Sequence, residues 1–177
     1  IKKKLPKISS LKNIEWSKIN IIFTALPNGE AQKISKKIPK NIKLIDLSGD
    51  FRLNDFSLYK KYYKSEHHAK NLIKKSIYSI TEFSRKKLPN YNIISCPGCY
   101  PTSIQLPLLP LIKAKLVKTD KIIIDSKSGY SGAGKKIEKR LKEKKFLNSI
   151  SAYGVGNHRH TPEINQELSK ASQRKIN

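Results

Sequence analysis

The sequence predicts an α/β protein built on a buried parallel sheet. Two short runs rich in isoleucine, 19–26 and 42–47, are apolar and lack the strict alternation of a half-exposed strand. Runs that are apolar on both faces suit strands covered by helices on each side. Segments of helical character separate these runs, and strands that alternate with helices pair in parallel.

Turn residues mark where the N-terminal elements end. The first run ends at Pro27-Asn28-Gly29, and the second breaks at Ser48-Gly49-Asp50. Residues 30–38 have helical character, and 56–65 are predicted to form a second short helix, whose tyrosines are expected to pack against a surface. Two further strands are predicted, at 77–80 and 91–95.

The residues around Cys99 place a thiol at the start of a helix. A strand-like run ends at Ser95, and the apolar stretch 102–117 is helix-like, with Pro101 suited to the first helical turn. Unpaired backbone N–H groups and the helix dipole stabilise a thiolate at that position, so Cys99 is a candidate nucleophile. A buried structural cysteine is the alternative interpretation.

Cys96 and Cys99 form a C-x-x-C pair, which can be a redox dithiol or half of a zinc site. The sequence holds no second C-x-x-C to complete a zinc site, and the surrounding pattern is not thioredoxin-like. We therefore predict no metal site here.

A second polar cluster, His158-Arg159-His160-Thr161-Pro162-Glu163, supplies groups that exchange protons with a nucleophile. One histidine of the pair can hold a proton near neutral pH. In an extended segment both rings lie on one face and Arg159 on the other, and His160 is favoured as the donor. A surface His-x-His pair, and a Glu163 that merely lies in the first turn of a helix, are the alternatives.

A strand-like run at 121–126 leads into a glycine loop and then a charged helix at 135–146. Strand, glycine loop and helix together can hold phosphate on backbone amides. Gly129 to Gly134 followed by Lys135 meets the first part of the P-loop pattern, but Lys136 stands where Ser or Thr is required. This departure argues against a nucleoside triphosphatase. A tight turn that needs positive φ is the structural alternative.

The net charge of +24 would ordinarily indicate nucleic-acid or anionic-membrane binding. Here the lysines are spread along the whole chain, and Lys, Ile and Asn share A/T-rich codons, so compositional bias explains the excess. We expect no specific nucleic-acid partner. No apolar run approaches the ~20 residues of a membrane span, and no signal peptide is visible, so we expect no membrane partner and a cytoplasmic location.

Five segments resemble, in the same order, the N-acetyl-gamma-glutamyl-phosphate reductase family, the NADP-dependent acyl-phosphate reductases of arginine biosynthesis. They are 25–29, 46–53, 97–102, 128–134 and 158–164. The sequence departs from the family pattern in four places. Asn28 replaces its usual His, Gly49 its Ala and Cys96 its common Asn, and 78–82 is a loose version of its Y-G-L-P-E segment.

The resemblance implies an incomplete Rossmann-type parallel sheet followed by the start of an α+β catalytic domain of the semialdehyde-dehydrogenase type. Residues 1–98 would be the C-terminal part of the NADP-binding domain, and 99–177 the first part of the catalytic and dimerisation domain. The family's glycine turn for the cofactor pyrophosphate would lie upstream of Ile1. The sequence is therefore expected to be an internal fragment, inactive by itself, of a homo-oligomeric enzyme.

The implied chemistry is reduction of a small acyl phosphate by NADPH. The Cys99 thiolate attacks the acyl phosphate, phosphate leaves, and the thioester accepts hydride. His160 or His158 supplies the proton, Glu163 orients a histidine or binds substrate, and Arg159 pairs with a carboxylate or supports the site. The resemblance also implies cofactor contacts, at Pro27, Ser131, Gly132 and Gly134.

Three alternatives remain open at this point. A reductase of lysine biosynthesis that acts on a carrier-protein-bound substrate shares these motifs. An aspartate-semialdehyde-type dehydrogenase is expected to have Asn-Cys-Thr around its nucleophile. A basic nucleic-acid-binding module needs lysines focused on one face with interleaved aromatic residues.

Overall fold

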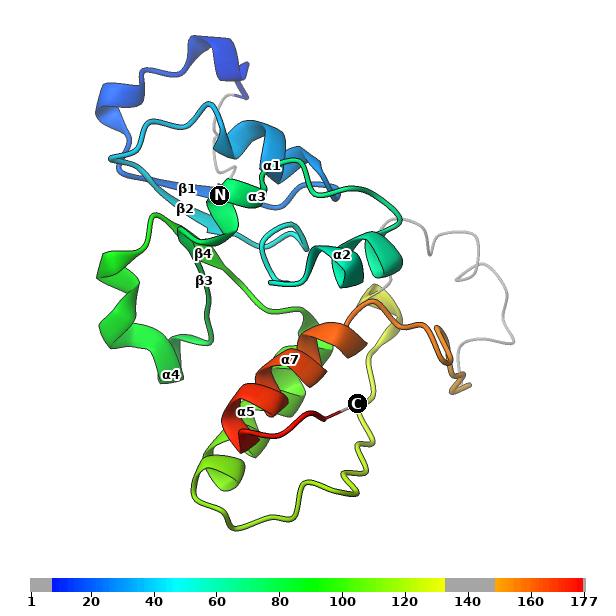
Figure 1. Ribbon diagram of the computed structural model, residues 1–177. Helices are drawn as coiled ribbons and strands as arrows, with labels where there is room; N and C mark the ends of the chain where they lie inside the picture. The colour runs from blue at the N-terminus through cyan, green and yellow to red at the C-terminus, as the bar shows by residue number, and fades with distance from the viewer. Residues whose placement is uncertain (1–7, 133–148, 177) are drawn as a thin grey trace, which may run out of the picture.

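A four-stranded parallel sheet forms the centre of the computed structural model, which describes residues 8–132 and 149–176. The strand order is β1-β2-β4-β3 (Figure 1). The strands are β1 (Ile21–Thr24), β2 (Lys43–Asp46), β3 (Ser76–Tyr78) and β4 (Ile93–Ser95). The four strands predicted before residue 96 are confirmed, each shorter than the apolar run that predicted it.

Helices precede and follow the strands, as an α/β fold requires. The α-helices are α1 (Glu30–Ser35), α2 (Phe56–Tyr63), α3 (Lys70–Ile73), α4 (Thr81–Ser84), α5 (Cys99–Lys113) and α7 (Thr161–Ser172). The 3-10 helices are η1 (Leu11–Asn13), η2 (Trp16–Lys18) and η3 (Arg85–Asn90). Local capping explains α2: the Asp55 carboxylate accepts hydrogen bonds from the N–H groups of Ser57 and Leu58, and Lys64 ends the helix in a left-handed conformation.

The first core lies between the sheet and helices α1 and α3. Leu44 on β2 pairs in register with Ile93 on β4, and both are buried. Ala31, Phe51 and Ile73 pack with them. The outer strand β1 is different, because Ile21 is 50% and Phe23 69% exposed. The prediction that this strand is covered on both faces is therefore wrong for the described part of the chain, where no helix packs over these two side chains.

The second core joins two helices that are far apart in the sequence. Leu109 and Ile112 of α5 pack against Leu168 of α7. Figure 1 shows α5 and α7 side by side, directly below the carboxyl end of β4. This packing carries the segment before α7 toward the start of α5.

The predicted strand at 121–126 is not observed. The segment forms no regular element and pairs with no strand among the described residues, and Ile123 is 94% exposed. A β-strand needs a neighbour for its N–H and C=O groups, so a β-rich sequence without one stays irregular. The predicted helix at 135–146 lies outside the described residues.

Candidate active site

The carboxyl ends of the four parallel strands lie at one edge of the sheet, where open α/β sheets bind their ligands. Each strand end leads into a segment that carries polar candidates. These segments are 26–29 after β1, 47–52 after β2, Tyr78 at the end of β3, and 96–99 after β4. The sheet topology therefore gathers residues from all four segments.

Cys99 is the first residue of α5, as predicted, and it is exposed with a free thiol. The helix N-terminus offers it unpaired N–H groups and a positive dipole end. Cys96 is half-buried, and burial followed by the nearby Asp46 charge raises the pKa of its thiol. The two cysteines thus have different environments, and that of Cys99 favours a reactive thiolate.

The two histidines lie together in a turn, not in the extended segment that was predicted. Thr161 N–H donates to the His158 carbonyl at 3.0 Å, and His160 N–H donates to His158 Nδ1 at 3.2 Å. The rings still lie on the same side, with centroids 5.0 Å apart. Because Nδ1 of His158 accepts a hydrogen bond, its neutral ring carries the proton on Nε2.

Tyr100 and Tyr153 complete a cluster of four aromatic rings with the two histidines. The Tyr100 centroid lies 5.4 Å from that of His158 and 6.2 Å from that of His160. Burial, then a hydrogen bond with Tyr100, raises the pKa of Tyr153 to about 12, with the Cys99 charge adding to the effect. The cluster therefore places both histidines beside Tyr100, the residue that follows Cys99.

The two histidines differ in burial. His160 is 3% exposed, and its Nδ1 has no hydrogen-bond partner among the described residues. Burial followed by the Arg52 and Arg159 charges lowers its pKa to about 3. His158 is half-buried, and burial followed by Arg159 lowers its pKa. His160 is therefore neutral at physiological pH, whereas His158 is nearer to solvent.

The ring of His160 packs against the backbone of Gly98. A methyl group added at Gly98 would lie 2.4 Å from His160 Nε2, although the Gly98 backbone (φ −69°, ψ 168°) suits any residue. The glycine is thus required for close approach and not for conformational freedom.

We expect Gly98→Ala to lower the free energy of unfolding by about 1–3 kcal/mol, because the added methyl group displaces the buried ring of His160. Urea denaturation measures the change. Gly129→Ala is the matched control, since a methyl group there meets only Ser131 Oγ at 3.9 Å; it should change stability by less than about 0.5 kcal/mol. Equal effects of the two substitutions would contradict the close packing of His160 on Gly98.

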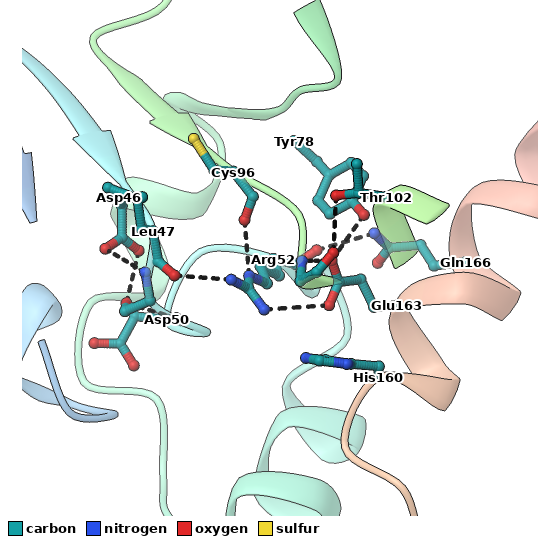
Figure 2. Close-up of polar contacts among 12 residues, drawn as sticks. Asp46, Leu47, Asp50, Arg52, Tyr78, Cys96, Thr102, His160, Glu163 and Gln166 are labelled. Atoms are coloured by element: carbon teal, nitrogen blue, oxygen red, sulfur yellow. Dashed lines mark hydrogen bonds and ion pairs between the residues drawn. The ribbon is translucent and has the colours of Figure 1, made fainter. Parts of the chain in front are cut away.

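Glu163 lies in the first turn of α7, fully buried. Its Oε1 accepts hydrogen bonds from Gly98 N–H at 2.8 Å and from the Tyr78 hydroxyl at 2.7 Å, and its Oε2 lies 3.5 Å from Arg52 Nη1. Burial raises the pKa of Glu163, and Arg52 with the two donors opposes that rise. Its partners are thus the loop before Cys99, Tyr78 and Arg52, and neither histidine is among them. Figure 2 shows this network, with His160 lying below it.

Arg159 is exposed and lines a small polar cavity of about 140 Å³. The cavity lies at the carboxyl ends of β1 and β2, and its lining residues are Leu26, Asn28, Leu47, Ser48, Gly49, Arg52, Tyr63 and Arg159. Among the described residues, Arg159 forms no ion pair and the buried Tyr63 hydroxyl has no hydrogen-bond partner. A methyl group at Gly49 would lie 2.5 Å from the Tyr63 ring, so the glycine makes room for that ring.

The residues implied as cofactor contacts fall in two places. Pro27 begins the turn between β1 and α1, where its carbonyl accepts from Glu30 N–H and Gly29 N–H donates to Asp50 Oδ1 at 2.7 Å. Ser131 and Gly132 lie in a tight turn closed by a hydrogen bond from Gly132 N–H to the Gly129 carbonyl.

The glycine turn does not depend on positive φ, since neither Gly129 nor Gly132 adopts it. A methyl group at Gly132 would meet the Ser128 hydroxyl, but Ser128 is exposed and its hydroxyl can rotate away, so space does not require this glycine either. Ser126, just before the turn, is hydrogen-bonded to Ser103 on α5 at 3.0 Å. Gly134 lies outside the described residues.

Sequence reasoning missed Arg52, Tyr63, Tyr78 and Tyr153 as members of this region. Arg52 and Tyr78 sit just after or at a strand end, which was an available signal, because parallel strand ends meet at one edge. No local feature of the sequence indicated that Tyr153 belongs to this region.

The fold and these motifs are those of one class of protein. Residues 2–91 match the family described as semialdehyde dehydrogenase, NAD binding domain, and residues 99–177 match semialdehyde dehydrogenase, dimerisation domain. The chain belongs to the semialdehyde dehydrogenase family.

Similar proteins within that class carry one enzyme name. A rice protein named probable N-acetyl-gamma-glutamyl-phosphate reductase, chloroplastic, is 45% identical over 97% of this chain and 41% of its own length. The N-acetyl-gamma-glutamyl-phosphate reductases of Rhodospirillum rubrum and Clostridium novyi are 42% and 47% identical, over 97% and 86% of this chain and 50% and 44% of their own lengths. The chain thus spans about half the length of the curated relatives it matches.

Proposed function

We propose that this chain belongs to an NADPH-dependent reductase that converts N-acetyl-gamma-glutamyl phosphate to N-acetylglutamate semialdehyde in arginine biosynthesis. The observation that carries the proposal is an exposed thiol at a helix N-terminus, followed by Tyr100, whose ring packs against a pair of histidines, in a chain whose relatives bear this enzyme name. Sulfur suits the first step, because a thioester accepts hydride better than an ester or a carboxylate does.

Cys99 acts as the nucleophile in this proposal. Its thiolate attacks the acyl carbon, the carbon–oxygen bond to phosphate breaks, and inorganic phosphate leaves with the bonding electrons. The helix dipole of α5 stabilises the thiolate before attack.

His158 is the proposed proton donor to the oxyanion that forms when the thioester is reduced. It is less buried than His160, so its ring can take up a proton from solvent. The imidazolium that forms when Nδ1 gives up its hydrogen bond from His160 N–H donates from Nε2 and returns to the neutral ring. The neutral ring of His160 packs on Gly98, and the backbone N–H of His160 donates to the neutral His158 ring. The burial of His160 is the reason for choosing His158 over the residue that the sequence favoured.

The polar cavity at the strand ends suits an anionic group of substrate or cofactor. Arg159 offers a guanidinium group and Tyr63 a hydroxyl without a partner among the described residues. Glu163, which the sequence placed with substrate, is fully buried, so in this proposal it acts from behind the site.

A nicotinamide cofactor fits the carboxyl edge of the sheet, where the cavity and the Pro27 turn lie. When bound, it supplies the hydride. Pro27, Ser131, Gly132 and Gly134 would hold it, and NADP(H) is the proposed form. The match to a dimerisation domain supports a homo-oligomer.

The cytoplasmic location and the absence of a specific nucleic-acid partner stay predictions. Two relatives, from rice and Arabidopsis thaliana, are named chloroplastic. No helix within the described ranges, 8–132 and 149–176, has the length and apolar character to cross a membrane.

The proposed reaction is tested by its substrate. Purified full-length protein is mixed with NADPH and N-acetyl-gamma-glutamyl phosphate, and loss of NADPH absorbance is followed. We expect turnover with this substrate and none with aspartyl phosphate. A higher kcat/KM with the carrier-protein-bound substrate of lysine biosynthesis, or with aspartyl phosphate, would overturn the assignment.

A further inference from the structure

The loop between β4 and α5 is held at both ends by one buried ion pair. Arg52 Nε donates to the Cys96 carbonyl at 2.8 Å, and Glu163 Oε1 accepts from Gly98 N–H at 2.8 Å. The guanidinium and carboxylate groups face each other at 3.5 Å, with side chains only 9% and 0% exposed. The three-residue loop Cys96-Pro97-Gly98 thus lies against the pair just before Cys99.

Each partner is itself fixed by other parts of the fold. Arg52 Nη2 donates to the Leu47 carbonyl at 2.8 Å, which ties it to the end of β2. The Tyr78 hydroxyl donates to Glu163 Oε1 at 2.7 Å from the end of β3. The backbone carbonyl of Arg52 accepts from Gln166 Nε2 at 3.0 Å, one turn further along α7.

The pair also bridges the two matched domains of the family. Arg52 lies in the segment matched to the NAD binding domain, and Glu163 in the segment matched to the dimerisation domain. In Figure 2 the Cys96 carbonyl points to Arg52 while the Cys96 sulfur points away. Arg52 therefore binds the backbone of the loop and not the Cys96 thiol.

We propose that Arg52 and Glu163 are positioning residues that together fix the Cys96-Pro97-Gly98 backbone and so hold the Cys99 thiol at the first position of α5. A buried ion pair contributes little net stability but fixes geometry, because each charge is satisfied only in one arrangement. The inference rests on Cys99 being the nucleophile of the proposed function. Neither positioning residue contacts substrate.

The direction in which the pKa of the Cys99 thiol changes when Glu163 is substituted distinguishes a positioning role from a simple charge effect. If Glu163 acted on Cys99 only through its negative charge, its removal would favour the thiolate and lower the pKa of Cys99. If it acts by holding the loop, its removal loosens Cys99 from the helix N-terminus, and the pKa of the thiol rises.

The experiment compares Glu163→Gln with Glu66→Gln in the full-length protein. Glutamine keeps one acceptor oxygen but turns an NH2 group toward either Arg52 or the Gly98 N–H, so it cannot hold both. Glu66 pairs with Lys60 at the surface, so its substitution leaves the loop contacts intact. Iodoacetamide modification of Cys99 is followed across pH by mass spectrometry of its own peptide. We expect the alkylation profile of Cys99 to shift to higher pH in Glu163→Gln and to stay unchanged in Glu66→Gln.

Turnover provides a second readout. We expect kcat to fall about a hundredfold in Glu163→Gln, the scale of a misplacement of about 1 Å, with KM changed much less. Tyr78→Phe removes only one of the donors to Glu163 Oε1, so a smaller change in the same direction is expected. It also provides the test should Glu163→Gln fail to fold.

An unchanged or lowered pKa of Cys99 in both Glu163→Gln and Tyr78→Phe would overturn the positioning role. Loss of thermal stability with an unchanged alkylation profile would also overturn it, because that is the signature of a purely structural pair. Alkylation needs no substrate, so this result stands apart from the substrate assay. A wrong substrate assignment would leave the alkylation result in place.

Discussion

Replacing Cys99 by serine in the full-length protein is expected to lower kcat at least about 10³-fold. A hydroxyl is far less acidic than a thiol, and the helix N-terminus that stabilises a thiolate does not ionise serine at neutral pH. The expected product of attack would also be an ester, a poorer hydride acceptor than a thioester. Steady-state NADPH oxidation measures the loss.

Cys96→Asn is the matched control for this prediction. The Cys96 side chain makes no hydrogen bond among the described residues, and its contact with Arg52 uses the backbone carbonyl, which asparagine retains. Most of the activity should therefore remain. Loss of activity in Cys96→Asn together with full activity in Cys99→Ser would reverse the assignment of the reactive thiol.

His158→Gln is expected to lower kcat by about 10²- to 10⁴-fold, the usual contribution of a general acid. The limb of the kcat–pH profile that reports the proton donor should disappear with it. His160→Gln should retain that limb, because the pKa of His160 is lowered to about 3 and the ring stays neutral throughout the working range.

Comparing the two histidine variants shows which of the two rings is the proton donor. His160→Gln should mainly reduce stability, since it removes a buried ring packed on Gly98. A pH limb that survives in His158→Gln and vanishes in His160→Gln would return the proton-donor role to His160. Urea denaturation of both variants separates loss of folding from loss of proton transfer.

Local signals were sufficient wherever one short stretch of sequence decides the structure. The strands around Leu44 and Ile93 were predictable because isoleucine-rich runs ended at turn residues. Cys99 at a helix start was predictable because a strand, a Pro-Gly pair and an apolar helical run follow one another. An isoleucine-rich run also predicted a strand at 121–126, but no strand forms there, because no neighbouring strand among the described residues pairs with that segment.

The sequence by itself thus determined the α/β class, the parallel strands and the position of Cys99 at the start of α5, because propensity and turn chemistry act over a few neighbouring residues. Only the tertiary structure decided how Arg52 meets Glu163, 111 positions away, and which histidine is buried. Ion pairing and burial depend on how the strand ends and α7 pack together, and the spacing of residues along the chain does not indicate that packing.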